Sequence, residues 1–105
     1  MTEIKYYIYE ELGEEELLCQ LAEECAELTQ AALKLRRAYT RKNPTPITDE
    51  EAISGLLEEI ADVRLCIETM FLNEEEEAEI KSTIERKMER WANRIREARE
   101  KAQKG

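Results

Sequence analysis

Histidine is absent from this chain of 105 residues, and there are only three glycines and two prolines. The lack of histidine excludes His-based acid–base catalysis and His-ligated zinc. A β-sandwich or barrel needs many turns, so the shortage of glycine and proline argues against these folds. The composition is 39% charged, 42% hydrophobic and only 6% aromatic, which instead favours helices.

Long apolar segments and a signal peptide are also missing, so we expect a cytoplasmic protein that does not engage a membrane. The net charge of −9 would repel a nucleic-acid backbone, and no nucleic-acid partner is expected. The three cysteines form no C-x-x-C pair. We expect them to be reduced thiols that pack in the core.

The spacing of apolar residues predicts a single all-α domain over residues 1–105. Within it we expect a short N-terminal helix or arm followed by three main helices, over 1–13, 14–40, 49–72 and 74–101. A chain of this length has a thin core. The predicted fold is therefore an antiparallel helical bundle completed by oligomerisation, as a homodimer or homotetramer.

Two of these helices carry local start signals. Thr48 followed by Glu51 predicts a capping box, and Asn73 precedes four consecutive glutamates that suit the positive end of a helix dipole. The helix expected over residues 14–40 should end before the segment Asn43-Pro44-Thr45-Pro46.

Two pairs of acids stand three residues apart within apolar helical patterns, Glu24 with Glu27 and Glu59 with Asp62. Residues at this spacing are neighbours on a helix surface. At about 100° per residue, Glu24 falls within about 20° of Leu17, inside the apolar stripe. A carboxylate in such a stripe is costly unless its charge is compensated. If the two helices face each other, the four acids form a cage for a cation.

Clustered carboxylates suit a hard divalent ion, so we expect Mg²⁺, with Mn²⁺ as the other option. Because Mg²⁺ commonly binds substrate phosphates as well, a di- or triphosphate is the natural substrate class. The chain has no Walker-type phosphate loop. Phosphate contacts must then come from side chains, and the candidates are Lys34, Lys87, Arg90 and Arg94.

Both sets of charged residues have a plainer interpretation. Each basic residue could belong to a solvated helix face, and Arg94 has Glu97 three residues on as a salt-bridge partner. Lys34, Lys87 and Arg90 have no acid three or four residues away. With 25 acids in the chain, one E-x-x-E spacing is weak evidence, and Glu74 to Glu77 reads as a solvated helix start.

The pattern Glu23-Glu24-x-x-Glu27 followed by Glu59-x-x-Asp62 resembles the E-E-x-x-E … E-x-x-D signature of the MazG-like, all-α nucleoside triphosphate pyrophosphohydrolases. The similarity covers about residues 15 to 98 and includes a basic final helix from Lys87 to Arg94. It differs in the long Pro-containing segment 39–49 and in Arg64, which falls within an apolar stripe.

The resemblance implies an oligomeric enzyme that uses Mg²⁺ to cleave a nucleoside or deoxynucleoside triphosphate to the monophosphate and pyrophosphate. It implies Glu24, Glu27, Glu59 and Asp62 as metal ligands. Glu23 would be a further ligand or would orient the attacking water. Lys34, Lys87, Arg90 and Arg94 would contact phosphates. The alternative is a non-enzymatic helical oligomerisation or partner-binding module on the same scaffold.

Overall fold

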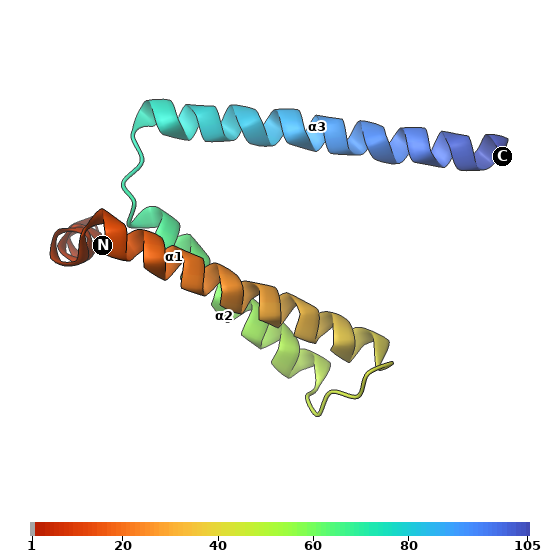
Figure 1. Ribbon diagram of the computed structural model, residues 1–105, viewed down its shortest axis with the longest axis horizontal. Coiled ribbons are helices and arrows are strands. Elements are labelled where there is room, and N and C mark those ends of the chain that lie inside the picture. Colours follow the sequence, from red (N-terminus) through yellow and green to blue (C-terminus); the bar gives the residue numbers. More distant parts are fainter. Residues whose placement is uncertain (1) are drawn as a thin grey trace. The chain divides into compact units, whose positions relative to one another are not determined.

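The computed structural model describes residues 2–105, which form helices and connecting segments without a strand in that range. The helices are α1 (Thr2–Thr40), α2 (Asp49–Glu68) and α3 (Glu74–Lys104) (Figure 1). The all-α prediction is thereby confirmed. The chain divides into two compact units, Met1–Phe71 and Leu72–Gly105, which are described separately.

Helix α1 contains a break at Gly13, where the sequence analysis expected the N-terminal segment to end. The residue has φ 79° and ψ 168°, a backbone conformation that essentially only glycine adopts. The segment before it is helical, so the expected short helix is the form that the structure shows.

Helices α1 and α2 pack against each other as an antiparallel hairpin (Figure 1). Its buried apolar residues are Leu17 and Ala38 from α1 and Ala52 and Cys66 from α2. This core is small, and large apolar side chains such as Leu18, Leu57 and Leu65 stay exposed. Cys19 and Cys25 are also exposed, so the prediction of a core position is wrong for these two cysteines.

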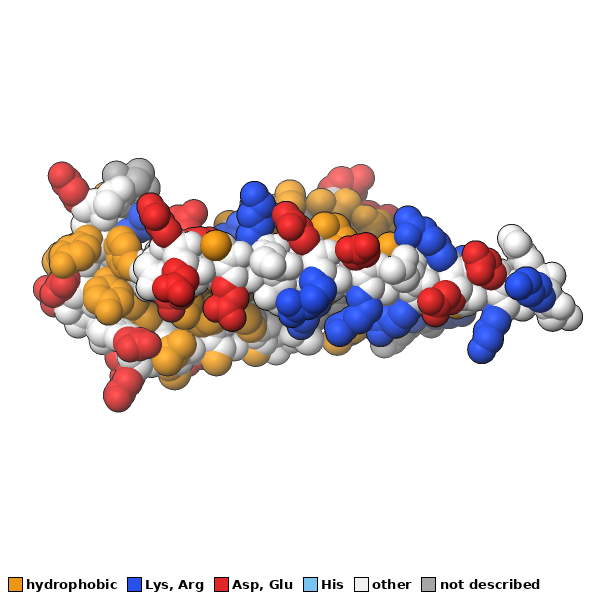
Figure 2. Space-filling view, turned by 90° about the horizontal axis from the view of Figure 1, so that it is seen from above, with side chains coloured by type: hydrophobic (Ala, Val, Ile, Leu, Met, Phe, Trp, Pro, Cys, Tyr) orange, Lys and Arg blue, Asp and Glu red, His pale blue; other side chains and the backbone are white. Residues whose placement is uncertain are grey.

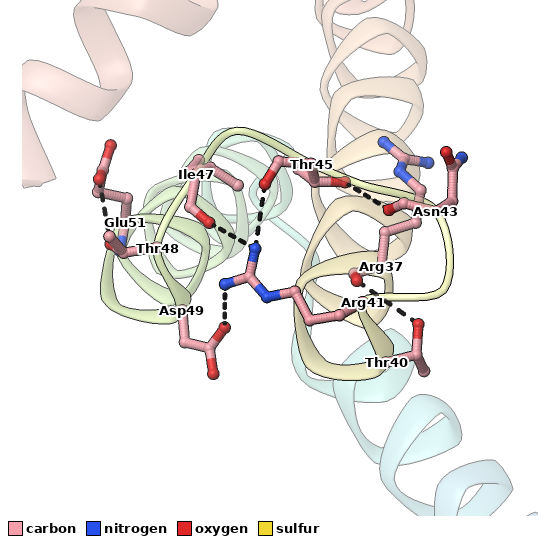
Figure 3. Close-up of polar contacts among 9 residues, drawn as sticks. All are labelled: Arg37, Thr40, Arg41, Asn43, Thr45, Ile47, Thr48, Asp49 and Glu51. Atoms are coloured by element: carbon pink, nitrogen blue, oxygen red, sulfur yellow. Dashed lines mark hydrogen bonds and ion pairs between the residues drawn. The ribbon is translucent and has the colours of Figure 1, made fainter.

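The connection between α1 and α2 is organised by Arg41 (Figure 3). Its guanidinium donates hydrogen bonds to the carbonyl oxygens of Thr45 (3.0 Å) and Ile47 (3.1 Å) and to Oδ1 of Asp49 (3.0 Å). Arg41 itself has a φ of 55°, the left-handed conformation with which helices commonly end. One side chain thus ties the end of α1 to the start of α2.

Helix α2 begins at the predicted N-cap but with only half of the predicted capping box, because the Glu51 carboxylate accepts from the Thr48 hydroxyl instead of its backbone amide, and it ends early. Thr48 is its N-cap and accepts a hydrogen bond from the amide of Glu51 at 3.1 Å. The helix ends at Glu68, before residue 72, and Phe71 takes a left-handed φ of 51°. The Phe71 ring then meets the N-terminal segment, edge-to-face with Tyr6 and Tyr9 at centroid distances of 5.8 and 5.6 Å.

Helix α3 starts with a complete capping box. The Asn73 side chain accepts from the Glu76 amide (2.8 Å), and the Glu76 carboxylate accepts from the Asn73 amide (3.0 Å). Acidic and basic side chains are interspersed along α3 (Figure 2). Its apolar stripe is exposed and consists of Ile80, Ile84, Met88, Trp91 and Ile95. The helix continues to Lys104, beyond the expected residue 101.

Within residues 2–105, none of the helices combines the length and the apolar character needed to cross a membrane.

Candidate metal-binding site

The hairpin brings together the four acids that the sequence predicts as a cation cage. Glu24 and Glu27 come from α1, and Glu59 and Asp62 come from α2. One carboxylate oxygen from each residue lies within 4.8 Å of the others. We call this group the four-acid cluster.

Helix periodicity and the antiparallel packing explain why these side chains meet. Within each helix the two acids are three residues apart, so both point to the same side of their helix. The two helices face each other along the stripes that contain Leu17 and Cys66, and both of these residues are buried. Acids that lie in these stripes or beside them therefore approach one another.

Two of the carboxylates are only partly accessible to solvent. Glu24 and Glu59 are half-buried, and Oε2 of each is shielded from solvent without a hydrogen-bond partner. The other oxygen of Glu24 accepts a hydrogen bond from Nε2 of Gln20 at 2.9 Å. A shielded carboxylate oxygen without a donor is unfavourable, because it has lost water and gained nothing in exchange. A positively charged partner would satisfy both of these oxygens.

The electrostatics of the cluster agree with this geometry. Burial raises the pKa of Glu24, and the negative charges of Glu27 and Asp62 raise it further, against the lowering effect of the Gln20 hydrogen bond. Burial likewise raises the pKa of Glu59, with the charges of Glu27 and Asp62 adding to it. Both shifts express the same conflict, in which like charges share a partly desolvated space.

A hard divalent cation would resolve the conflict, and the donor set fits one. All four donors are carboxylate oxygens, the ligands that Mg²⁺ and Ca²⁺ prefer. Opposite ligands of a Mg²⁺ ion lie about 4.2 Å apart, twice the metal–oxygen distance of about 2.1 Å. The cluster's limit of 4.8 Å exceeds this spacing by about 0.6 Å, so a small inward shift of the side chains would close the four acids around the ion.

A groove of about 650 Å³ adjoins the cluster between α1 and α2. Glu27 and Glu59 line one end, and Lys34, Arg37 and Ile47 line the part nearer the interhelical connection. The small residues Ala31, Ala52 and Gly55 leave the space between them open, and the remaining wall is formed by Gln30, Leu33 and Glu51. We call this feature the α1–α2 groove.

Of the other predicted site residues, only Lys34 shares this groove. Glu23 is exposed and outside the four-acid cluster, with Oε1 4.0 Å from the Sγ of Cys19. Arg64, which the helical pattern placed in an apolar stripe, is exposed. The remaining basic candidates, Lys87, Arg90 and Arg94, lie on α3 in the second unit, so their role toward the cluster stays a prediction.

Three further residues lie at this site without having been predicted from the sequence. Gln20 donates to Glu24, and its position four residues earlier on the same helix was the available signal. Arg37 lines the groove. Cys66 is buried on α2; burial raises the pKa of its thiol, and the charges of Glu24 and Asp62 raise it further.

Comparison with known proteins adds no assignment to this geometry. None of the protein-family models, curated proteins or solved structures that were searched matches the chain.

Proposed function

We propose that the four-acid cluster binds Mg²⁺ and that the protein is a Mg²⁺-dependent nucleotide pyrophosphohydrolase. The substrate would be a nucleoside or deoxynucleoside triphosphate, and the products would be the monophosphate and pyrophosphate. One observation supports this most directly. Four carboxylates from two helices converge within 4.8 Å, and two of their oxygens are shielded from solvent without a partner.

The proposed reaction is a hydrolysis at the α-phosphorus. A water oxygen forms a bond to this phosphorus while the bond to the bridging oxygen of the pyrophosphate breaks. The electron pair of the broken bond leaves with the pyrophosphate, and the water gives its proton to solvent. Bound Mg²⁺ would supply charge neutralisation of the phosphates and a lowered pKa for a coordinated water.

The chain's own residues would hold this arrangement in place. Glu24, Glu27, Glu59 and Asp62 are the proposed metal ligands, and the Gln20 hydrogen bond fixes one oxygen of Glu24. Lys34 lines the adjoining groove and is a proposed phosphate contact. Lys87, Arg90 and Arg94 are proposed as further phosphate contacts, and Glu23 as a residue that orients the water.

Pyrophosphate release from a panel of nucleotides tests the activity. We expect turnover of at least one triphosphate with Mg²⁺ or Mn²⁺ and none after chelation. Asp62→Asn should abolish it while the circular dichroism spectrum stays helical. Glu58→Gln is the matched control, because this exposed acid belongs to α2 but not to the cluster. Absence of turnover across normal and modified nucleotides with both metals contradicts the proposal.

We also propose that the protein is a cytoplasmic homodimer or homotetramer. Helix α3 is a single helix in its own unit, so it cannot bury its own apolar stripe. The hairpin likewise has a small core and exposed leucines. Exposed free thiols at Cys19 and Cys25 suit a reducing compartment. Light scattering should give a dimer or tetramer, and a monomer at micromolar concentration contradicts this part of the proposal.

The same exposed apolar surface favours the alternative function, a non-enzymatic oligomerisation or partner-binding module. In that case the Asp62→Asn variant would assemble normally and neither protein would turn over a nucleotide. The nucleotide panel and the light-scattering measurement together separate the two functions.

A further inference from the structure

The two ends of the α1–α2 groove differ in charge. We infer that Lys34 and Arg37 bind the pyrophosphate portion of the substrate, so that the triphosphate lies along the groove with its terminal phosphate toward the connection between α1 and α2. This orientation rests on the proposed function. It assigns a ligand-binding role to Arg37 and predicts on which side of the four-acid cluster the leaving group lies.

The first support is the shared helix face. Glu27, Gln30, Lys34 and Arg37 all line the groove and follow each other at steps of three, four and three residues along α1. At 1.5 Å per residue, Lys34 and Arg37 lie about 10 and 15 Å beyond Glu27 along the helix axis. Long side chains on a helix lean toward its N-terminus. This general preference favours a lean of both side chains toward the acidic end of the groove.

The second support is that these two positive charges have no acidic partner. Among residues 2–105 the structure has ion pairs at Lys5 and Arg41, and neither Lys34 nor Arg37 forms one. Arg41, one turn beyond Arg37, is instead committed to Asp49 (Figure 3). Arg37 is half-buried, whereas its neighbour Arg36 is exposed and does not line the groove. A guanidinium that lines a groove and has no counter-ion is available to bind an anion.

The third support is the space between the two ends. The open stretch of the groove is bounded by small residues, and a Cβ added at Gly55 would meet no atom within 4 Å. One acid, Glu51, also lines this end, and its Oε1 accepts a hydrogen bond from the Thr48 hydroxyl at 3.0 Å. Lys34 and Arg37 outnumber it, which leaves this end positive.

This arrangement has a consequence for the proposed reaction. Negative charge develops on the bridging oxygen as the pyrophosphate leaves, and fixed cations on that side stabilise the charge. Placing the leaving group on Lys34 and Arg37 separates it from the acids, while the nucleoside extends from the opposite side of the α-phosphate. Longer phosphate chains should therefore bind better than monophosphates, whatever the base.

Inorganic tripolyphosphate is the probe that isolates this site, because it has no nucleoside. We would measure its binding by titration calorimetry with Mg²⁺ present, using wild type, Lys34→Gln, Arg37→Gln and the control Arg36→Gln. All three variants lose one positive charge. We expect the first two to weaken binding about tenfold, as expected for one lost charge-assisted contact, and Arg36→Gln to change it less than about twofold.

Two further measurements test the orientation and the groove. Binding of a nucleoside monophosphate should be the same in wild type and Arg37→Gln. Gly55→Leu should block tripolyphosphate binding without a change of charge, while Mg²⁺ still raises the melting temperature of this variant. If all three charge variants weaken tripolyphosphate equally, or if wild type does not bind it, the inference is wrong. Equal loss of monophosphate affinity would overturn the orientation.

These outcomes separate the inference from the proposed function. If wild type, Lys34→Gln and Arg37→Gln hydrolyse nucleotides equally well, the function stands and the inference fails. If no nucleotide is hydrolysed but tripolyphosphate binding depends on Arg37, the function fails and the anion site stands.

Discussion

Removing one negative charge from the four-acid cluster should make the metal-free protein more stable and abolish its stabilisation by Mg²⁺. The change is Glu59→Gln, which keeps the size of the side chain and removes a charge from a half-buried position. Without metal, the wild-type protein holds four carboxylates within 4.8 Å, two of which have a shielded and unpaired oxygen. Less repulsion should therefore raise the melting temperature of the metal-free variant.

The effect of Mg²⁺ can be estimated from binding linkage. A ligand at ten times its Kd stabilises the folded state by RT ln 11, about 1.4 kcal/mol. For a chain of this size that corresponds to a rise of roughly 6 to 11 °C in melting temperature. Wild type should show this rise. Glu59→Gln should show little of it, because it lacks one of the four proposed ligands.

The assay is thermal unfolding followed by circular dichroism at neutral pH, with and without Mg²⁺, at a constant ionic strength of about 0.15 M. Glu58→Gln is the control, since it removes the same charge from the neighbouring exposed residue. If Mg²⁺ raises the melting temperatures of wild type and both variants equally, the ion acts by screening the net charge. Specific binding of Mg²⁺ at the four-acid cluster would then be refuted.

Three further predictions follow from particular residues. The raised pKa values of Glu24 and Glu59 mean that these two carboxyls bind protons more tightly in the folded metal-free protein than in the unfolded chain. Their contribution to stability should be fully present below the usual carboxyl pKa of about 4.3 and be lost as the pH rises through the raised values. Urea unfolding of wild type and Glu59→Gln across this pH range isolates the contribution, and the variant should show the weaker pH dependence. Arg41→Ala removes an ion pair and hydrogen bonds that tie α1 to α2, so it should lower the free energy of unfolding. The loss should be only about 1 kcal/mol, because these contacts are largely exposed to solvent. An unchanged urea midpoint would contradict the role of Arg41 in joining the two helices. Gly13→Ala should destabilise the protein by about 1 to 3 kcal/mol, because alanine does not tolerate the Gly13 backbone conformation. Gly55→Ala should stabilise it by about 1 kcal/mol, because Gly55 lies within α2 and an added Cβ meets open space. If both substitutions shift the urea midpoint in the same direction, backbone conformation does not distinguish the two glycines.

Much of the local structure was readable from the sequence because it depends on neighbours in the chain. Thr48 and Asn73 were predicted as helix starts, and the structure confirms both caps. The early end of α2 was not predictable in this way. Phe71 leaves the helix to pack on Tyr6 and Tyr9, more than sixty residues earlier in the chain, and helical periodicity contains no information on such a contact.

The acids of the cluster were identifiable from the sequence because their spacing along each helix is local. Glu24 lies in an apolar stripe and Glu27 is one helical turn away, so their anomaly was visible before any fold was known. The groove was not visible, because its open space depends on how closely α1 and α2 approach at small residues such as Ala31 and Gly55. The orphaned oxygens of Glu24 and Glu59 likewise result from packing, which sequence spacing does not reveal.

Because the hairpin has a thin core, its stability should depend strongly on the four-acid cluster. The hairpin has few buried apolar side chains, yet it places four carboxylates at the contact between its two helices. Without a cation these acids oppose the packing of α1 on α2, and with one they become ligands that join the two helices. Metal binding and the stability of the hairpin should therefore be coupled, since the same carboxylates govern both. A site that binds metal but leaves the melting temperature unchanged would be inconsistent with ligands drawn from both helices.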